Sequence, residues 1–205
     1  MGCRSGAAGR RPLSSSRRAR VKLGGVTTTV WTIGHSTRSL DELVDLLRAH
    51  GVELLADVRT RPGSRRLPHF DREALERELP AAGIEYAHVP ALGGLRPARA
   101  DSPNMAWRNQ SFRGYADHMQ TEGWRAALDG LIEDAGRRRV AVMCAEAVPW
   151  RCHRSLIADA LTARGLEVRH IVGPGAAARH SLTPFAHVDG DRITYPGTSR
   201  LPLDG

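Results

Sequence analysis

The chain has 205 residues and a formal net charge of +8, and it contains no apolar run long enough to cross a bilayer, so no membrane span is expected. This length suits one domain, or one domain with tails, that can bury a substantial core. Residues 1–25 hold seven Arg or Lys and no Asp or Glu, and removing those seven from the 30 basic groups leaves 23 against 22 acidic ones. The body is therefore nearly neutral and is not itself a basic nucleic-acid groove.

The segment 1–25 is rich in Gly, Ser and Arg and has neither helical nor strand periodicity, so it is predicted to be a disordered basic tail. It lacks the apolar core of a secretory signal and only weakly resembles a transit peptide. An alternative interpretation is that translation starts nearer Val21 or Val26. Three cysteines without an export signal indicate reduced thiols and a cytoplasmic location, and Cys3, in the tail, is interpreted as incidental.

The first half of the body alternates between strand and helix patterns. Ser39 and Glu42 form a capping box ahead of an apolar helical face that ends before Gly51. Apolar or β-branched runs predict strands at 28–33, 52–58 and 84–88, and a second helix is predicted over 71–81. The loop 60–69 between them is rich in breakers and positive charge.

The second half begins with a long polar loop over 90–110, of the kind that is usually functional or mobile. Helices are predicted over 112–119 and 121–135, a buried strand over 140–143, a helix from Cys152 to Gly165, and a fifth strand over 167–172. Asp189-Gly190 is a hairpin turn signal. Three segments follow: a tail over 1–25, an α/β domain over 26–175, and a C-terminal extension over 176–205 with a possible hairpin.

This alternation predicts a single-domain α/β fold, with a mostly parallel sheet of about five strands and helices on both faces, a Rossmann-like three-layer arrangement. Polar side chains stand where the predicted strands end. Because the carboxyl ends of parallel strands meet at one edge, we expect a set of these groups to border one pocket there. That set is His35, Asp57, Arg59, Glu146 and Arg154.

Residues 139–159 read as strand, loop and helix, and they concentrate two thiols, a carboxylate, an imidazole and two guanidinium groups. Cys144 ends the strand, like the nucleophile of rhodaneses and cysteine phosphatases, although a buried structural thiol is the alternative. Cys152 begins a helix beside His153 and Arg154, so it is expected to hold the thiolate and to be alkylated faster than Cys144. A reversible disulfide, or a metal site completed by a further histidine, are further alternatives.

Two carboxylates offer a second chemical centre. Glu146 and Asp57 would serve as general acid and base if one of them had a raised pKa. The alternative is a structural ion pair with Arg59, Arg65 or Arg154. These same arginines suit the binding of phosphate or carboxylate through their planar fork. Aromatic side chains would either stack on a base or cover the core, namely Trp107, Tyr115 and Trp150.

Four stretches of the chain resemble the family catalogued as domain of unknown function 488. They are Thr32-Ile-Gly-His-Ser36, Asp57-Val-Arg59 with Ser64-Arg65, Leu92-Gly93-Gly94, and Met143-Cys-Ala-Glu-Ala-Val-Pro-Trp-Arg-Cys-His-Arg154. The resemblance covers about residues 28–172. It implies an α/β fold and a role for these positions, and it implies no particular activity.

The leading hypothesis is an enzyme that hydrolyses, or transfers a group on, an anionic substrate derived from a nucleotide or nucleic acid. The catalytic candidates are Glu146, Asp57, Cys152, Cys144 and His153. The substrate-binding candidates are His35, Ser36, Arg59, Ser64, Arg65, His88, Gly93, Gly94, Tyr115 and Arg154. The alternatives are a rhodanese-like or redox thiol enzyme and a non-catalytic nucleic-acid-binding module. No cofactor, metal or membrane partner is expected, and the oligomeric state stays open.

Overall fold

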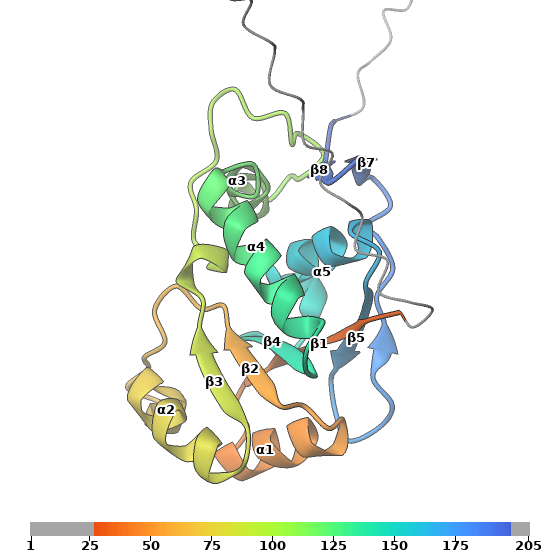
Figure 1. Cartoon of the computed structure of the whole chain (residues 1–205). Helices are drawn as coiled ribbons and strands as arrows, with labels where there is room; N and C mark the ends of the chain where they lie inside the picture. The colour runs from red at the N-terminus through yellow and green to blue at the C-terminus, as the bar shows by residue number, and fades with distance from the viewer. Residues whose placement is uncertain (1–26, 198–205) are drawn as a thin grey trace, which may run out of the picture.

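The computed structural model describes residues 27–197, which form one α/β domain around a six-stranded sheet in the order β3-β2-β4-β1-β5-β6 (Figure 1). The strands are β1 (Thr29–Gly34), β2 (Leu54–Asp57), β3 (Glu85–His88), β4 (Val140–Cys144), β5 (Glu167–Ile171) and β6 (Ala178–Arg179). The α-helices are α1 (Leu40–Ala49), α2 (Arg72–Ala81), α3 (Gln110–His118), α4 (Glu122–Ala135) and α5 (Arg154–Ala163). Short 3₁₀ turns are η1 (Pro68–Phe70), η2 (Pro90–Leu92) and η3 (Pro149–Arg151).

The strand pairing confirms the predicted parallel sheet. β1 lies between β4 and β5, with Val30 opposite Val140 and Val168, and β2 lies between β4 and β3. All of these pairs are parallel. Two additions come from the C-terminal segment: β6 joins the edge of the sheet antiparallel to β5, and β7 (His187–Asp189) and β8 (Arg192–Thr194) form a separate hairpin. The predicted hairpin turn is present, with Gly190 at a φ of 57°.

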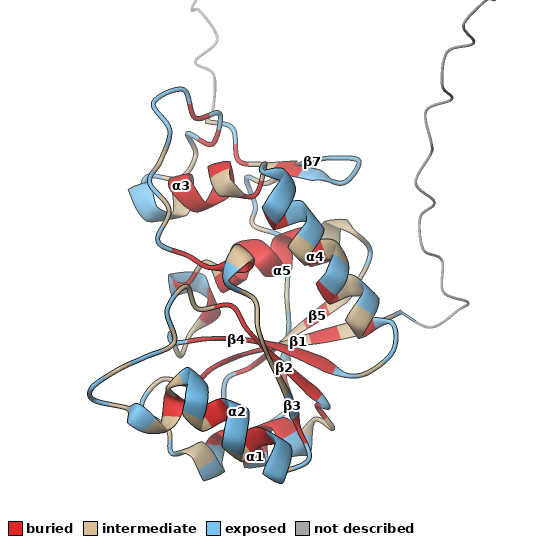
Figure 2. Ribbon diagram, turned by 60° about the vertical axis from the view of Figure 1, so that its left-hand side comes forward, coloured by how far each residue is buried: buried red, intermediate tan, exposed pale blue. Residues whose placement is uncertain are grey.

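Helices cover both faces of the sheet, which makes three layers (Figure 2). One core lies under α1 and α2 and includes Ala141 and Met143; the other lies under α3, α4 and α5 and includes Val140, Val142 and Cys144. The division follows the two-residue period of a strand, because successive side chains point to opposite faces. This period also decides which polar groups at the strand ends can meet.

The predicted capping box is formed at the start of α1. The Ser39 hydroxyl accepts a hydrogen bond from the Glu42 amide at 3.1 Å, and the Ser39 amide donates to the Glu42 carboxylate at 2.7 Å. These two bonds satisfy donors that the first turn of a helix leaves unpaired. They fix where the chain turns after β1.

The long irregular stretch between η2 and α3 is held in place from within the fold. The buried Asp117 carboxylate on α3 accepts hydrogen bonds from the Arg99 amide at 2.9 Å, the Ser102 hydroxyl at 2.6 Å and the Asn104 side-chain amide at 2.8 Å. Three bonds to one buried carboxylate define a single path for the loop. These bonds anchor the part of the stretch from Arg99 to Asn104 to α3.

No helix within residues 27–197 is both long enough and apolar enough to cross a membrane. The predicted tail with Cys3, and the last residues of the predicted C-terminal extension, lie outside the described residues.

Candidate functional site at the carboxyl edge of the sheet

The carboxyl ends of β1 and β4 are the natural place for a site in this topology. β1 leads into α1 on one face and the neighbouring β4 leads into α5 on the other, so the two connections diverge (Figure 1). Here the strand pairing continues past the strand ends, with the His35 amide donating to the Cys144 carbonyl at 3.0 Å and the Ser36 amide to the Ala145 carbonyl at 2.9 Å. Ser36 takes a positive φ of 52° to make this turn. Backbone therefore fills much of the crevice.

The side chain of Arg154 lies against these backbone groups. It is 0 % exposed. Its Nη1 group donates to the carbonyl oxygens of Ile33 at 2.8 Å and Glu146 at 3.0 Å, and its Nη2 group to that of Ala147 at 3.2 Å. The expectation that Arg154 binds a substrate anion from solvent is wrong, because the guanidinium is buried and its fork is directed at the protein's own backbone.

Arg154 also contacts a sulfur atom, with Nη1 2.8 Å from Cys144 Sγ. Among residues 27–197 the guanidinium forms no ion pair with a carboxylate, so this sulfur is the one group it touches there that can carry a negative charge. Arginine keeps its proton in proteins, and a buried cation needs an anion close by. This contact therefore favours the thiolate form of Cys144.

The second thiol supports this assignment. The Sγ atoms of Cys152 and Cys144 are 2.6 Å apart, so one sulfur donates a hydrogen bond to the other, and the guanidinium beside Cys144 favours Cys144 as the acceptor. This hydrogen bond, together with the charge on Arg154, lowers the pKa of Cys144 although burial opposes it. The same hydrogen bond, together with burial, raises the pKa of Cys152.

The geometry favours the opposite order of the two thiols from the one expected. The N-terminus of α5 carries only a partial positive charge, and its Arg154 amide lies 3.5 Å from Cys152 Sγ. The full positive charge of the Arg154 guanidinium lies closer to the other sulfur, 2.8 Å from Cys144 Sγ. The closer and larger charge favours ionisation of Cys144 over Cys152. Both cysteines are buried, with exposed fractions of 1 % for Cys144 and 5 % for Cys152.

His153 completes the group around the thiols. Its Nε2 atom lies 3.3 Å from the Val58 carbonyl, which can only accept, so Nε2 carries the proton and Nδ1 is free to accept. Nδ1 lies 3.5 Å from Cys152 Sγ. Burial lowers the pKa of His153 to about 4, so the ring is neutral near pH 7 and is oriented to accept a proton from Cys152.

Gly94 packs directly against the imidazole ring of His153, where a side chain would not fit. A Cβ atom on Gly94 would lie 2.8 Å from His153 Nδ1, closer than side chains pack. The Thr60 hydroxyl fixes the loop by donating to the Gly94 carbonyl at 2.8 Å. Gly93 packs in the same way against Thr60, with a Cβ position only 2.5 Å from its hydroxyl oxygen. The predicted Gly-Gly element is thus a close cover over His153.

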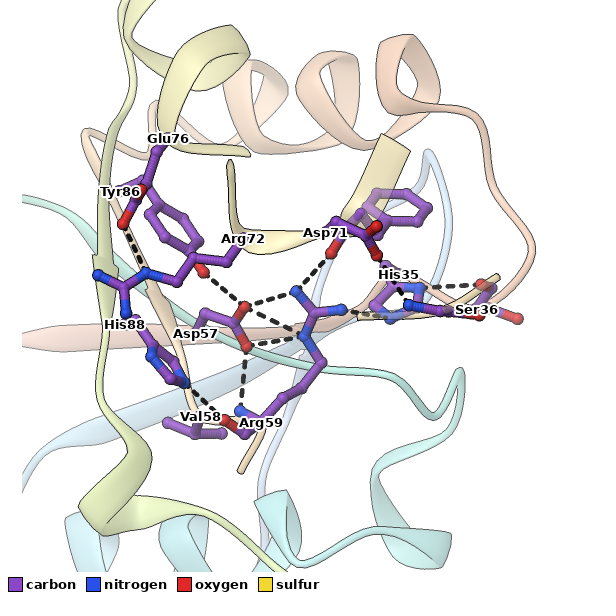
Figure 3. A network of polar contacts seen from close by, with 12 residues as sticks. His35, Ser36, Asp57, Val58, Arg59, Asp71, Arg72, Glu76, Tyr86 and His88 are labelled. Carbon is purple, nitrogen blue, oxygen red and sulfur yellow. Dashed lines mark hydrogen bonds and ion pairs between the residues drawn. The ribbon is translucent and has the colours of Figure 1, made fainter. Parts of the chain in front are cut away.

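Asp57 belongs to a different cluster, shown in Figure 3. Its carboxylate is paired with Arg59, with Nη2 at 2.6 Å and Nε at 2.9 Å, and it also accepts from the Tyr86 hydroxyl at 2.8 Å. Asp57 is 0 % exposed. Of the two interpretations of this residue, the structural ion pair matches the geometry, because both carboxylate oxygens are occupied. By contrast, the Glu146 side chain is exposed and has no partner among the described residues.

His35 adjoins the same pair. Its Nδ1–H donates to the Ser36 carbonyl at 2.9 Å, its Nε2 accepts from Arg59 Nη1 at 3.3 Å, and its ring stacks on Phe70 with centroids 4.3 Å apart. Burial and the nearby Arg59 charge lower the pKa of His35 to about 4. His35 is thus a neutral, fully engaged ring at neutral pH.

The predicted residues share one edge of the sheet, on two different faces. Cys144 lies in the core under α3, α4 and α5. Asp57 contacts Tyr86 (Figure 3) and His35 stacks on Phe70, and both of these aromatic residues belong to the core under α1 and α2. The residues are divided between two faces of the sheet because the two-residue period of a strand sends successive side chains to opposite faces. Two surface hollows of about 160 and 200 Å³ lie elsewhere and include none of these residues.

The other predicted binding residues are mostly engaged within the fold. His88 lies 2.9 Å from the Arg59 carbonyl, the Ser64 amide donates to Asp71 at 2.7 Å, and the buried Tyr115 donates to the Leu92 carbonyl at 2.8 Å. Tyr115 therefore packs against His153 and does not present a face for stacking on a base. Exposed groups are Arg65 and Trp150, the latter 69 % exposed. Within residues 27–197 no cluster of ligating side chains is arranged to hold a metal.

One buried network was not predicted. Thr32 Oγ1 lies 2.7 Å from His170 Nδ1, His170 Nε2 lies 3.0 Å from His180 Nδ1, and His180 Nε2 lies 2.9 Å from Asp159, which also accepts from the Tyr195 hydroxyl at 2.8 Å. It ties the C-terminal segment to α5. The register of β1 and β5, which pairs Thr32 with His170, is what brings the first two together.

We expect the protein to lose stability as the pH falls from 6.5 to about 4. His35, His153 and His170 each have a folded-state pKa of about 4, mainly because of burial, against an ordinary value of 6.5. In this window the unfolded chain binds protons that the folded chain excludes, so the free energy of unfolding should fall by roughly 1.4 kcal/mol per pH unit for each such histidine. Urea unfolding at a series of pH values measures this slope. A His170→Gln variant should have a shallower slope, and a flat wild-type profile would contradict the expectation.

Comparison with known proteins agrees with the motifs. The family described as Domain of unknown function DUF488 matches residues 39–161. Neither the curated proteins nor the solved structures give a match to the chain. The matched span runs from the capping serine of α1 to Leu161 in α5, so it contains Asp57, Gly94 and the whole Cys144–Arg154 element. With well over half of its length matched, the chain belongs to the DUF488 family.

Proposed function

We propose that this protein is a thiol enzyme in which the Cys144 thiolate is the nucleophile in group transfer from an anionic substrate. The observation that carries the proposal is the contact between a wholly buried guanidinium, that of Arg154, and Cys144 Sγ at 2.8 Å. A cysteine is nucleophilic as the thiolate, and a neighbouring cation keeps that form populated at neutral pH.

The reaction begins with attack of Cys144 Sγ on the electrophilic atom of the substrate. A bond from sulfur to that atom forms, and the leaving group departs with its electron pair. Water then takes the group from sulfur and regenerates the thiolate, with the released proton passing to solvent. Neutral His153 lies beside the thiols with Nδ1 as an acceptor, so it is placed to take a proton during this exchange.

An anionic substrate class is supported by the charges at this edge. Arg61, Arg65 and Arg151 are exposed, and none forms an ion pair among the described residues. They are carried by the loops that follow β2 and β4, the loops that hold Thr60 and Cys152. Free guanidinium groups bind phosphate and carboxylate, so phosphate-bearing molecules, nucleotides among them, are the class to test first.

A carboxylate mechanism has less support, because Asp57 is buried and both its oxygens are occupied. The nucleic-acid-binding alternative rests on the basic residues of 1–25, which lie outside the described residues.

The test is the pH dependence of alkylation, measured in a Cys3→Ser background so that two thiols remain. Iodoacetamide labelling of Cys144 is expected to change little between pH 6 and 8, because its thiolate is already formed. Labelling of Cys152 is expected to rise about tenfold per pH unit, as for a thiol that titrates at or above about 8.5. Peptide mass spectrometry gives both rates from one sample.

The shape of the profile is decisive because limited access of the reagent slows the labelling of both thiols by a factor that does not depend on pH. A Cys152→Ser variant is the matched control, since Cys144 should remain labelled with a flat profile when it is alone with Arg154. A Cys144 profile that rises tenfold per pH unit in the parent protein would refute the proposal.

A further inference from the structure

The two thiols, and not Cys144 alone, form a reactive unit. Their sulfur atoms are 2.6 Å apart and are both buried, and the chain between them is one short loop with the η3 turn. We propose that Cys144 and Cys152 are a dithiol–disulfide couple, and that Arg154 makes its disulfide form strongly oxidising. This inference extends the proposed function, since it rests on the same Cys144 thiolate.

The reason lies in the charge that oxidation removes. In the reduced state the buried guanidinium of Arg154 faces the Cys144 thiolate at 2.8 Å and pairs with no carboxylate among the described residues. A disulfide carries no charge, so oxidation leaves this buried cation facing a neutral sulfur. An uncompensated buried charge is strongly unfavourable. The reduced state is therefore the more stable one, and the disulfide of such a couple is readily reduced.

After oxidation Arg154 would have no other charged partner among the described residues. Its Nε atom is buried and already has no hydrogen-bond partner, and its other bonds go to neutral carbonyl oxygens. No carboxylate in the described residues replaces the thiolate without a rearrangement of the loop. A disulfide that closes a short loop usually stabilises a fold, so this one should behave in the opposite way.

The exchange partner is a low-molecular-weight thiol or its disulfide. In the oxidising direction the Cys144 thiolate attacks one sulfur of the small disulfide and expels one thiolate. Cys152 then gives up its proton, to which His153 Nδ1 at 3.5 Å is the nearest acceptor, and attacks the mixed disulfide. A second thiolate leaves and takes up that proton. The protein loses two electrons and the small disulfide gains two; the reverse reaction oxidises two small thiols.

The experiment measures the equilibrium of the couple in mixtures of reduced and oxidised glutathione. The full chain carries Cys3→Ser, and samples start from both the reduced and the diamide-oxidised protein so that slow access to the thiols does not bias the result. After acid quenching, free thiols are labelled and counted by mass. We expect the equilibrium constant for disulfide formation to rise on the order of 100-fold when Arg154 is replaced by methionine.

A second measurement keeps the test independent of whether that variant folds. The oxidised form of the Cys3→Ser protein should melt at a lower temperature than its reduced form, and a Cys144→Ser/Cys152→Ser variant should be unaffected by diamide. A higher melting temperature after oxidation, or an equilibrium constant unchanged in Arg154→Met, overturns the inference. Failure to form the disulfide at all also overturns it, while a flat alkylation profile for Cys144 would leave the proposed function intact.

Discussion

Replacing Arg154 by methionine is expected to abolish the thiolate character of Cys144. Methionine has a similar length and no charge, so only the hydrogen bond from Cys152 would then oppose the burial of the Cys144 thiol, and the pKa of Cys144 should rise toward the ordinary value of about 8.5. The rate of alkylation of Cys144 at pH 7 should fall at least tenfold, and its flat pH profile should become a rising one. Labelling with iodoacetamide followed by peptide mass spectrometry gives both quantities.

The same substitution should lower the stability by about 3 kcal/mol or more. The carbonyl oxygens of Ile33, Glu146 and Ala147, the first of them in a buried hydrogen bond and the others in part-buried ones, would lose this donor, and each unsatisfied buried group costs about 1–3 kcal/mol. Urea unfolding of the reduced protein measures this loss.

The variant Arg154→Lys separates the effect of the positive charge from the effect of the guanidinium hydrogen bonds. Lysine retains a cation near Cys144 but cannot reach all three carbonyl oxygens, so stability should fall while the flat alkylation profile is largely kept. If Arg154→Met is alkylated at Cys144 with the same flat profile as the parent, the guanidinium does not determine the charge of that thiol.

The strands, the helices and the edge where they end could be predicted because the signals are local. An apolar run over 140–143 and a capping box at Ser39 each specify an element from a few neighbouring residues. Strand direction then follows from the alternation of strands and helices. The edge that carries His35, Asp57 and Cys144 was foreseeable on these grounds.

The partners at that edge were not foreseeable, because they depend on which strands are neighbours and which face each residue takes. Tyr86 reaches Asp57 since β3 pairs with β2 in a register that sets Leu55 opposite Tyr86. Asp57 and Cys144 share the edge, yet they lie on opposite faces. No pattern within either strand contains that relation.

The assignment of the thiolate shows the same limit. The start of a helix is visible in the sequence and favoured Cys152, whereas the contact between Arg154 and Cys144 arises only when α5 packs against β1 and β4. The β6 strand and the network around Asp159 also depend on tertiary packing, since Ala178–Arg179 is too short to give a strand pattern. Local patterns therefore predicted where the candidate site lies, whereas tertiary contacts determine which of its thiols is favoured as the thiolate.

Gly34→Ala is expected to unfold the site, and much of the domain with it. An added Cβ atom on Gly34 would lie 1.7 Å from the Glu146 carbonyl oxygen and 3.0 Å from Arg154 Nη1. The first of these is a backbone atom, so the overlap is relieved only by separating β1 from the loop after β4. This would break the bond from the His35 amide to the Cys144 carbonyl and move the guanidinium away from Cys144. We expect a loss of stability of about 3 kcal/mol or more.

Gly130→Ala is the matched control, because it adds the same methyl group inside α4, where nothing lies within 4 Å of the new atom. Alanine in a helix interior should stabilise the protein by about 0.5–1 kcal/mol. Urea unfolding of both variants, with Cys144 alkylation at pH 7 on whatever remains folded, gives the comparison. Gly34→Ala within about 1 kcal/mol of the parent, with Cys144 still labelled as a thiolate, would show that β1 and the Cys144 loop tolerate separation. In that case the contact between Arg154 and Cys144 Sγ would not depend on the close approach of the two backbone segments at Gly34.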